Sequence, residues 1–542
     1  MKLRGQAALR IIPLFVLSLA AGQEATPLTG TADVGRAQLE SHTIGDNWLS
    51  YNGDYSGRRY SSLTQITPAN IKKLRAAWVF HSSHAGTLEA TPVVVDGVMY
   101  LTASNNAYAL DAANGRILWH YSRPVSPGLV DDASGHISRG VALWEHRLYM
   151  ETDNAHLLCL DARSGALLWD IAYATWNRNY GATSAPLVVG RKVLVGTSGG
   201  DDGVRGFIAA YDAVTAKLLW RRWTIPGPGE FGSSSWPGKS YLHGGGTAWM
   251  PGTYDPELNT LYWGTGNAAP DYDGSVRPGD DLYTASLLAL DLDTGRMKWY
   301  FQFTPHDVYD YDGVETPVLI DGLYQGKPRK LLVEANRNGF IYTLDRVSGK
   351  FLSATRFADR VNWARGIDAH GRPIYTSVQP TDSGTLTCPG DVGATNWYSP
   401  AYNEVTKYLY FISLDQCTVN YVKPQVFSPG TEYYATGTRE DPSGKGRKYL
   451  LAFDRDTNHF AWKYPQEGDT HSWGGVMTTA TGLVFFADDT HSFEAVDART
   501  GKPLWHFNTG QTLHASPMTY SVTGRQFVAI ASGDNLFAFA LP

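Results

Sequence analysis

Short apolar segments alternate along the chain with turns rich in Gly, Asp and Asn, a pattern that predicts β-strands rather than helices. In one example, an apolar strand leads to Asp111, a turn containing Gly115 follows, and a second strand carries Trp119. The spacing D-x-x-x-G-x-x-x-W then recurs along the chain. Its aspartates are Asp111, Asp161, Asp212, Asp291, Asp345, Asp454 and Asp497, and the Trp positions are Trp119, Trp169, Trp220, Trp299, Ser353, Trp462 and Trp505.

The repeat predicts a strand, a tight turn and a second strand whose Trp packs against a neighbouring unit, as in the blades of a β-propeller. Each unit needs an inner strand before the Asp. Candidates for this strand begin near Pro92, Val141, Pro186, Pro251, Pro317, Pro400, Thr478 and Pro517. We therefore expect an all-β fold, a single eight-bladed propeller with tryptophan-docking motifs. The alternative, two unrelated β domains, leaves the common register unexplained.

The last unit lacks its own Asp–Gly–Trp segment, because the chain ends soon after the eighth inner strand. A Trp without such a unit, Trp78, stands near the start of the chain. We expect strands from the two termini to share one blade, which closes the ring and covers its last edges. Two intervals between repeats are longer than the others, and we expect a long loop insertion at about 354–450 and a shorter one before Asp291.

The first residues are typical of a cleaved secretory signal: Lys2, Arg4 and Arg10 precede an apolar run that ends in small residues. We assign residues 1–22 to a signal peptide and 23–542 to the propeller, in the periplasm; a buried or anchoring N-terminal helix is the alternative. Of three cysteines, we expect Cys388 and Cys417 to pair and Cys159 to stay a buried thiol.

The charge balance argues against a general affinity for nucleic acid or an anionic membrane, since the net charge is −6. No later stretch approaches the length of a membrane span. No CxxCH motif occurs, so we expect no c-type haem.

Polar residues recur in the turns that follow apolar strands. Blades are related by rotation about one axis, so equivalent turns should surround the same mouth of a central funnel. Asp201, Asn267, Arg337 and Asp488 stand in such turns, and the loop with Asp310 and Asp312 leads into the next inner strand. Singly, each residue could be an ordinary turn former or ion-pair partner. Together, several carboxylates and an amide oxygen form a site for a hard cation rather than for zinc.

Several segments in one order give a more specific indication. They are Asp46–Trp48, Gln65–Trp78, Gly199–Gly206, Gly264–Asn267, Arg277–Asp280, Thr304–Asp310, Arg337–Gly339 and Trp473–Gly475. Across nearly the whole mature chain, the sequence resembles the quinoprotein alcohol dehydrogenases of the methanol dehydrogenase group. These enzymes use pyrroloquinoline quinone (PQQ).

The resemblance implies a role for each matching position. Asp310 matches the catalytic base, and Arg337 matches the cation that contacts the quinone oxygen. The implied metal ligands are Asp201, Asn267, Asp310 and Asp312; Asp312 matches an extra carboxylate typical of lanthanide-dependent members, so we expect a lanthanide ion, with Ca²⁺ as the alternative. The implied cofactor-binding residues are Glu89, Arg139, Thr183, Ser198, Trp249, Arg337, Asn396 and Trp473.

Two positions depart from the family pattern. Asp201 replaces a glutamate, with Asp202 as a possible substitute, and no adjacent cysteines precede Arg139. We expect a periplasmic dehydrogenase that oxidises an alcohol and passes electrons to a separate acceptor, a soluble cytochrome c or a membrane quinone. The alternatives are a non-catalytic propeller scaffold of the outer-membrane assembly kind and a quinoprotein that binds its cofactor without turnover.

Overall fold

The computed structural model describes residues 33–41, 43–83, 86–129, 131–442, 444, 446–468 and 472–542. The signal peptide expected at 1–22 lies outside them. Strands dominate the described chain. Its helices are short: α1 (Arg36–Leu39), α2 (Asp131–Ser134), and the 3₁₀ turns η1 (Ile71–Lys73), η2 (Trp176–Arg178), η3 (Gly200–Asp202), η4 (Ser233–Ser235), η5 (Ser240–His243) and η6 (Gly274–Val276).

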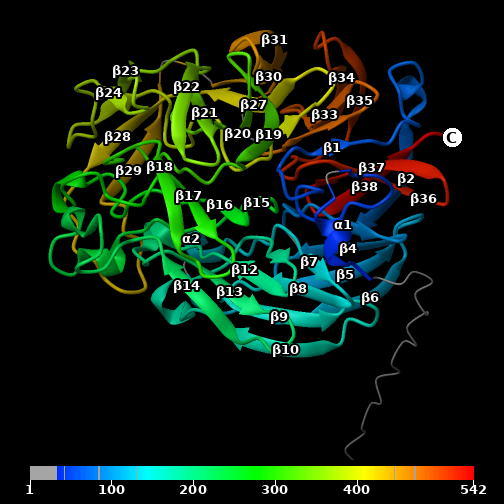
Figure 1. Ribbon diagram of the computed structural model, residues 1–542, viewed down its shortest axis with the longest axis horizontal. Coiled ribbons are helices and arrows are strands. Elements are labelled where there is room, and N and C mark those ends of the chain that lie inside the picture. Colours follow the sequence, from blue (N-terminus) through cyan, green and yellow to red (C-terminus); the bar gives the residue numbers. More distant parts are fainter. Residues whose placement is uncertain are drawn as a thin grey trace, which may run out of the picture.

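Seven four-stranded sheets and one five-stranded sheet are present among the described residues, and they follow one another around the molecule (Figure 1). The first four are β3 (Val93–Val95), β4 (Val98–Ala103), β5 (Asn106–Asp111) and β6 (Ile117–Ser122); β7 (Ala142–Trp144), β8 (Arg147–Glu151), β9 (His156–Asp161) and β10 (Leu167–Ala172); β11 (Leu187–Val189), β12 (Lys192–Val195), β13 (Phe207–Asp212) and β14 (Leu218–Trp223); and β15 (Thr253–Asp255), β16 (Thr260–Gly264), β17 (Ser286–Asp291) and β18 (Met297–Gln302).

The other four sheets include the five-stranded one and the sheet shared by the two ends of the chain. They are β19 (Val318–Tyr324), β20 (Lys327–Ala335), β21 (Phe340–Asp345) and β22 (Lys350–Arg356); β26 (Ala401–Tyr402), β27 (Tyr408–Asp415), β30 (Arg447–Asp454) and β31 (His459–Gln466); β1 (Tyr60–Ser61), β32 (Val476–Thr479), β33 (Leu483–Ala487), β34 (Ser492–Asp497) and β35 (Pro503–Asn508); and β2 (Arg75–His81), β38 (Asn535–Ala540), β37 (Arg525–Ser532) and β36 (Met518–Val522).

The predicted inner strands are confirmed, because the first strand of each unit begins within two residues of the predicted position. Some of the repeat tryptophans contact the next unit. The indole N–H of Trp119 donates to the carbonyl of Ala162, and that of Trp220 donates to Leu292, both at 2.9 Å. Each acceptor follows a repeat Asp. At Gly165, an added Cβ would lie 2.7 Å from Trp119, so a larger residue would collide with the ring.

The two termini meet in one sheet, as predicted: β2 pairs antiparallel with β38 (Figure 1). The indole N–H of Trp505 donates to the carbonyl of Leu74 at 3.1 Å, which joins this region to the preceding sheet. The sequence pattern did not predict β1, which pairs parallel with β32. The N-terminal segment therefore covers the edges of two neighbouring sheets.

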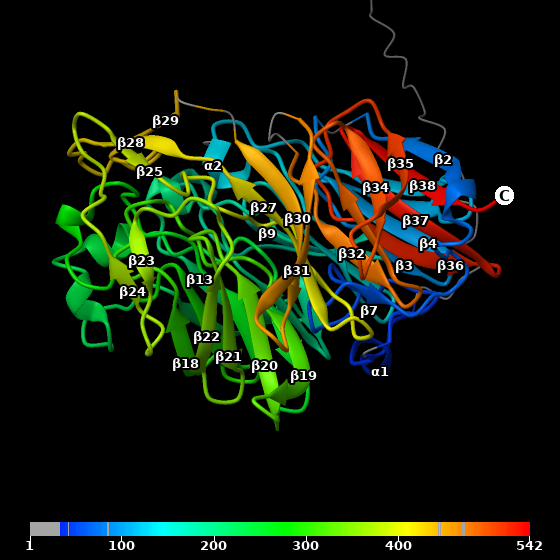
Figure 2. The same cartoon turned by 90° about the horizontal axis from the view of Figure 1, so that it is seen from above.

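The expected insertion at 354–450 holds β26 and β27, and it also forms two smaller sheets. These are β23 (Ala364–Ile367) with β24 (Pro373–Tyr375), and β25 (Thr385–Thr387) with β28 (Thr418–Val422) and β29 (Thr436–Glu440). Figure 2 shows them at the opposite side of the molecule from β36–β38. Cys388 and Cys417 form the predicted disulfide, and Cys159 is a buried free thiol.

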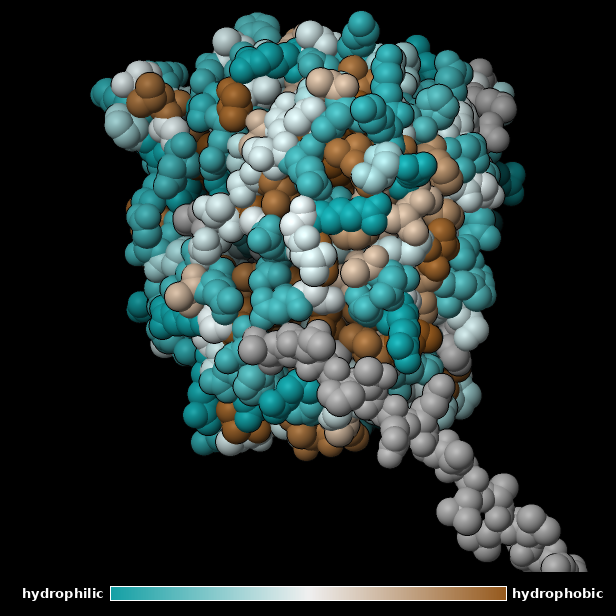
Figure 3. All heavy atoms as spheres, turned by 90° about the vertical axis from the view of Figure 1, so that its right-hand side faces the viewer, coloured by the Kyte–Doolittle hydropathy of each residue, from teal (hydrophilic) through white to brown (hydrophobic). Residues whose placement is uncertain are grey.

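Helices in the described chain are all too short or too polar to serve as a membrane span. On the face drawn in Figure 3, hydrophilic side chains predominate and hydrophobic ones are scattered between them. The large apolar side chains lie mainly in the clusters between sheets.

Candidate active site

The turns that follow the apolar strands converge on one cavity of about 370 Å³. Asp201 lies in η3 after β12, Asn267 follows β16, and Arg337 lies between β20 and β21. Asp310 and Asp312 come from the loop between β18 and β19. Short backbone contacts fix the loops: the Gly266 N–H donates to Thr247 at 2.7 Å, and the Gly313 N–H donates to Thr265 at 2.9 Å. Residues distant in sequence thus share one site, as predicted.

Arg337 binds both aspartates of the 310–312 loop. Its Nη1 donates to the Asp310 carbonyl at 2.9 Å and lies 3.3 Å from Asp310 Oδ1, and its Nη2 lies 2.8 Å from Asp312 Oδ2. The other Asp312 oxygen accepts the backbone N–H of Asn267 at 2.6 Å, and the Asn267 side-chain amide donates to Asp201 at 2.9 Å. Hydrogen bonds and ion pairs therefore connect all five residues.

Asp271 joins this group, although the sequence interpretation missed it. One carboxylate oxygen each from Asp201, Asp271 and Asp310 lies within 4.8 Å of the others. Asp271 is 1% exposed. The signal that could have found it is its position four residues after Asn267, in the same loop. Three carboxylates at this spacing are suited to an oxygen-ligated cation.

The electrostatic environment follows from burial and crowding. Burial raises the pKa of Asp310 well above its ordinary value; Arg337 opposes this effect, while Asp201 and Asp312 add to it. Burial also raises the pKa of Asp271, and the charges of Asp201 and Asp310 act in the same direction. Such carboxylates need a proton or a cation to balance them.

Aromatic rings and a second arginine form another part of the cavity. The Arg139 guanidinium lies 5.1 Å from the ring centre of Trp249 and 4.3 Å from that of Trp397, and its Nη2 is 2.8 Å from Glu89. Trp249 and Trp473 both pack against one hydrophobic cluster, which includes Trp397. The cavity thus combines a flat aromatic surface with a buried cation.

The predicted cofactor residues fall into two groups. Those that line the cavity are Arg139, Thr183, Ser198, Trp249 and Arg337. Glu89, Asn396 and Trp473 are not in its lining. Glu89 pairs with Arg139, Asn396 accepts from Arg337 at 3.3 Å, and Trp473 packs against the same hydrophobic cluster as Trp249. Asp488, expected at the same mouth from its turn, is also not in the lining; it accepts from Thr490 instead.

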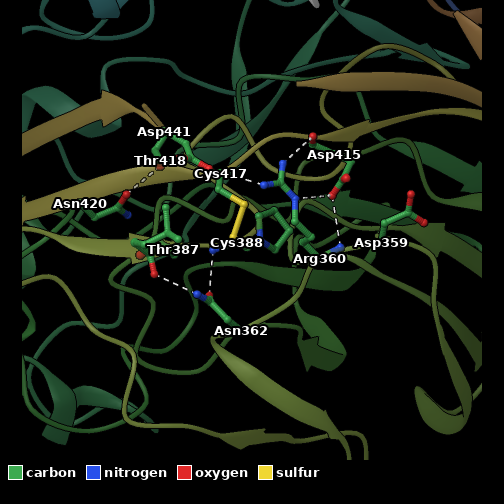
Figure 4. The surroundings of a disulfide bond; sticks show 12 residues. Asp359, Arg360, Asn362, Thr387, Cys388, Asp415, Cys417, Thr418, Asn420 and Asp441 are labelled. Carbon is green, nitrogen blue, oxygen red and sulfur yellow. Dashed lines mark hydrogen bonds and ion pairs between the residues drawn. A yellow bond between two sulfur atoms is a disulfide. The ribbon is translucent and has the colours of Figure 1, made fainter. Parts of the chain in front are cut away.

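The disulfide lies at the base of the loop that supports Arg337. Two hydrogen bonds fix this loop, residues 389–396. The Tyr311 hydroxyl donates to the Pro389 carbonyl at 2.5 Å, and the Ala394 N–H donates to the Arg337 carbonyl at 2.7 Å. Around Cys388 and Cys417, Arg360 pairs with Asp415 (Figure 4). The insertion at 354–450 therefore supports Arg337, a central residue of the site, by a hydrogen bond to its backbone.

No adjacent cysteines precede Arg139 in this chain, and other residues of the segment before Arg139 line the cavity instead. Ser134, Gly135 and Ile137 line it, and the Ala133 carbonyl accepts the Ser198 hydroxyl. This segment includes α2, which packs against η3 and so lies beside Asp201.

Comparison with known proteins is consistent with this arrangement. The family model described as "Glucose/ethanol/alcohol dehydrogenase, beta-propeller domain" (PQQ) matches residues 48–356 and 446–528. Quinohemoprotein alcohol dehydrogenase ADH IIB of Pseudomonas putida is 37% identical over 94% of this chain and 77% of its own length. Quinoprotein alcohol dehydrogenase PedH of P. putida is 34% identical over 96% and 92%.

Solved structures show the same similarity. The quinohemoprotein alcohol dehydrogenase from Comamonas testosteroni superposes with a TM-score of 0.88, at 34% identity, over 94% of this chain and 83% of the other. A europium-containing methanol dehydrogenase gives a TM-score of 0.86, at 29% identity, over 93% of this chain and the whole of the other.

Proposed function

The chain belongs to the family of PQQ-dependent quinoprotein alcohol dehydrogenases, and from this premise we propose that it oxidises an alcohol in the cavity between Asp310 and Trp249. The observation that carries the proposal is the convergence of Asp201, Asn267, Asp310 and Arg337 on this cavity. A scaffold protein has no need to bury these polar groups together, because each costs desolvation free energy.

The residues present fit PQQ, a flat molecule with three carboxylates and a quinone. A cavity of about 370 Å³ is large enough for a compact cofactor. The ring of Trp249 offers a flat stacking surface. Arg139 and Arg337 supply guanidinium groups, which suit carboxylate and quinone oxygens. We propose Glu89, Arg139, Thr183, Ser198, Trp249, Arg337, Asn396 and Trp473 as the cofactor-binding set.

The same cavity fits a hard cation beside the cofactor. We propose Asp201, Asn267, Asp310 and Asp312 as the ion-binding set, of which Asp312 also binds Arg337 and the Asn267 backbone. A trivalent ion balances several neighbouring carboxylates better than a divalent one, so we favour a lanthanide over Ca²⁺.

PQQ, held by Arg139, Trp249 and Arg337, would supply the two-electron redox chemistry for oxidation of the alcohol, and the ion held by the ion-binding set would supply Lewis-acid polarisation. Asp310 is the base that takes the hydroxyl proton of the alcohol. Arg337 holds the Asp310 backbone at 2.9 Å and presents positive charge where negative charge develops on oxygen. Asp312 anchors Arg337 from the other side.

We also propose an architecture, a location and an electron acceptor for this enzyme. The eight sheets form the blades of one propeller, with the repeat tryptophans as docking residues and residues 23–542 as one domain. The enzyme works in the periplasm after removal of residues 1–22. It passes electrons to a separate acceptor, a soluble cytochrome c or a membrane quinone.

The test is reconstitution of the purified protein with PQQ and La³⁺ or Ca²⁺, followed by dye reduction across a panel of alcohols. We expect alcohol-dependent dye reduction that is lost in Asp310→Asn, while PQQ binding persists in that variant. Binding without turnover in the wild type would favour an inactive quinoprotein. If the protein takes up neither PQQ nor ion, the scaffold function replaces this proposal.

A further inference from the structure

The Asp271 carboxylate is buried without a protein partner. It is 1% exposed, and neither of its oxygens has a hydrogen-bond partner among the described residues. A carboxylate in such surroundings is unfavourable unless a charge or donor compensates it. The structure therefore leaves this side chain ready for a group that is not part of the protein.

The nearest arginine on this loop is already occupied elsewhere. Arg277 pairs with the Asp281 carboxylate at 2.5 Å, and it donates to the backbone carbonyls of Pro270 and Asp271, both at 3.0 Å. The Arg277 side chain thus binds the backbone of the loop and does not form an ion pair with the Asp271 side chain. The loop is thus fixed while its carboxylate stays available.

The Asp271 carboxylate lies close to those of Asp201 and Asp310, which line the cavity. One oxygen each of Asp201, Asp271 and Asp310 lies within 4.8 Å of the other two. Ions of the Ca²⁺ type bind oxygen at about 2.3–2.6 Å, so two oxygens on opposite sides of one ion stand about 4.6–5.2 Å apart. Three oxygens at this spacing lie at most about 2.8 Å from a common centre, so small movements of the side chains suffice for a single ion to contact all three.

Asp312 has a different environment. One of its oxygens accepts the Asn267 N–H at 2.6 Å, and the other lies 2.8 Å from Arg337. Asp312 is thus paired with Arg337, whereas the Asp271 carboxylate has no hydrogen-bond partner among the described residues, although the nearby charge of Arg277 favours its ionised form.

We infer that Asp271 is a direct ligand of the active-site cation in this chain, together with Asp201 and Asp310. The inference rests on the proposed function, because that function supplies the ion. With three carboxylates in contact, the site carries a charge that a trivalent ion matches. Asp271 is then a determinant of ion choice as well as of affinity.

Terbium(III) luminescence tests this assignment without any turnover. Metal-free protein is titrated with Tb³⁺, and emission lifetimes in H₂O and D₂O give the number of water molecules on the bound ion. We expect Asp271→Asn to weaken Tb³⁺ binding at least about tenfold. In Asp271→Ala, which removes the ligand oxygen altogether, we also expect about one more coordinated water, because solvent fills the position that the carboxylate leaves.

Asp391→Asn is the matched control. Arg337 Nη1 donates to the carbonyls of both Asp310 and Asp391, so Asp391 is close to the site, but its carboxylate accepts from Thr438 at 2.7 Å and from the Val392 N–H at 2.9 Å. This control removes a nearby charge without removing a proposed ligand. We expect the hydration of bound Tb³⁺ to be unchanged in Asp391→Asn.

Asp271→Ala, with the melting temperature of each metal-free variant, guards against loss of folding. Both Asp271 variants should melt no lower than the wild type without ion and gain less on adding Tb³⁺. Wild-type affinity in Asp271→Asn, or wild-type affinity and hydration in Asp271→Ala, would overturn the inference while leaving the proposed function intact. If the wild type binds neither Tb³⁺ nor Ca²⁺ nor PQQ, the proposed function fails, and the ligand assignment fails with it.

Discussion

Arg337 is held in place by Asp312, whose carboxylate lies 2.8 Å from its Nη2. The opposite edge of the guanidinium reaches the backbone of Asp310, the proposed base. The planar, forked geometry of the guanidinium allows it to bind both groups at once, which the ammonium of lysine cannot do in the same way. The position of the base therefore depends on the forked guanidinium of an arginine, which a lysine at this position would not replace.

Replacing Arg337 by lysine keeps the charge and removes the fork. We expect kcat to fall roughly 10²–10³-fold, the range for loss of one group that stabilises developing charge. Steady-state kinetics of the PQQ-reconstituted protein measures this. Arg329→Lys is the control. Arg329 forms a similar ion pair, with its Nη1 2.7 Å from Asp345, but neither residue lines the cavity. An Arg337→Lys enzyme with wild-type kcat would contradict this role.

The choice of ion follows from the crowded carboxylates. We expect La³⁺ to bind at least about tenfold more tightly than Ca²⁺ in the presence of PQQ, a difference of about 1.4 kcal/mol. Asp312→Ala should reduce this preference, because it removes one negative charge from the site. Competition titrations check both expectations. Equal affinities, or an Asp312→Ala variant with undiminished preference, would argue for a calcium enzyme.

The disulfide should affect both stability and activity. Its cysteines are 29 residues apart in sequence, so its removal in Cys388→Ser/Cys417→Ser should cost about 3–4 kcal/mol. The loop 389–396 that contacts Arg337 would also loosen, so we expect kcat to fall even well below the melting temperature. Denaturant unfolding and kinetics on the same samples separate the two effects.

Cys159→Ala serves as the control for loss of a cysteine, since Cys159 is buried within β9 and forms no disulfide. It should lower stability without a matching loss of kcat in the remaining folded enzyme. Wild-type kcat in the double serine variant would limit the disulfide to a purely stabilising role.

The stability of the folded protein should depend on pH through the buried side chain of Glu151. Burial raises its pKa well above the ordinary value, and the Tyr173 hydroxyl and the Ser184 backbone only partly oppose this. Since the folded protein holds the proton more tightly than the unfolded chain, this contribution is fully present below the ordinary carboxyl pKa. It is lost as the pH rises toward the pKa of the folded state.

Glu151→Gln should therefore raise the melting temperature relative to the wild type at pH 8, by on the order of a few degrees, and give no gain at pH 4. Thermal unfolding at the two pH values measures this. The exposed Glu432, changed to Gln, is the control and should alter neither value. A gain of equal size at both pH values would point to packing rather than to proton binding.

The repeat explains why so much of the fold could be predicted. Each Asp–Gly turn is local, and several tryptophans pack on a glycine of the next unit, as Trp119 does on Gly165. Strand starts and the pairing of β2 with β38 follow from that regularity. The parallel bridge of β1 to β32 does not, because it involves two residues outside any repeat.

The candidate site was predictable where its residues follow strands directly, as Asp201 and Asn267 do. Asp271 lies further along an irregular loop, whose path is set by contacts from Arg277 to main-chain carbonyls. Trp397 stacks on Arg139 from the insertion, for which the repeat gives no register. Such positions depend on tertiary contacts that no local pattern encodes.

Anomalous diffraction from crystals of the protein grown with PQQ and a lanthanide tests the central claim most directly. We expect one strong anomalous peak within about 2.6 Å of an oxygen from each of Asp201, Asp271 and Asp310, with PQQ density on the face of Trp249. An anomalous peak elsewhere, or a cavity that stays empty of both at saturating concentrations, would contradict the account.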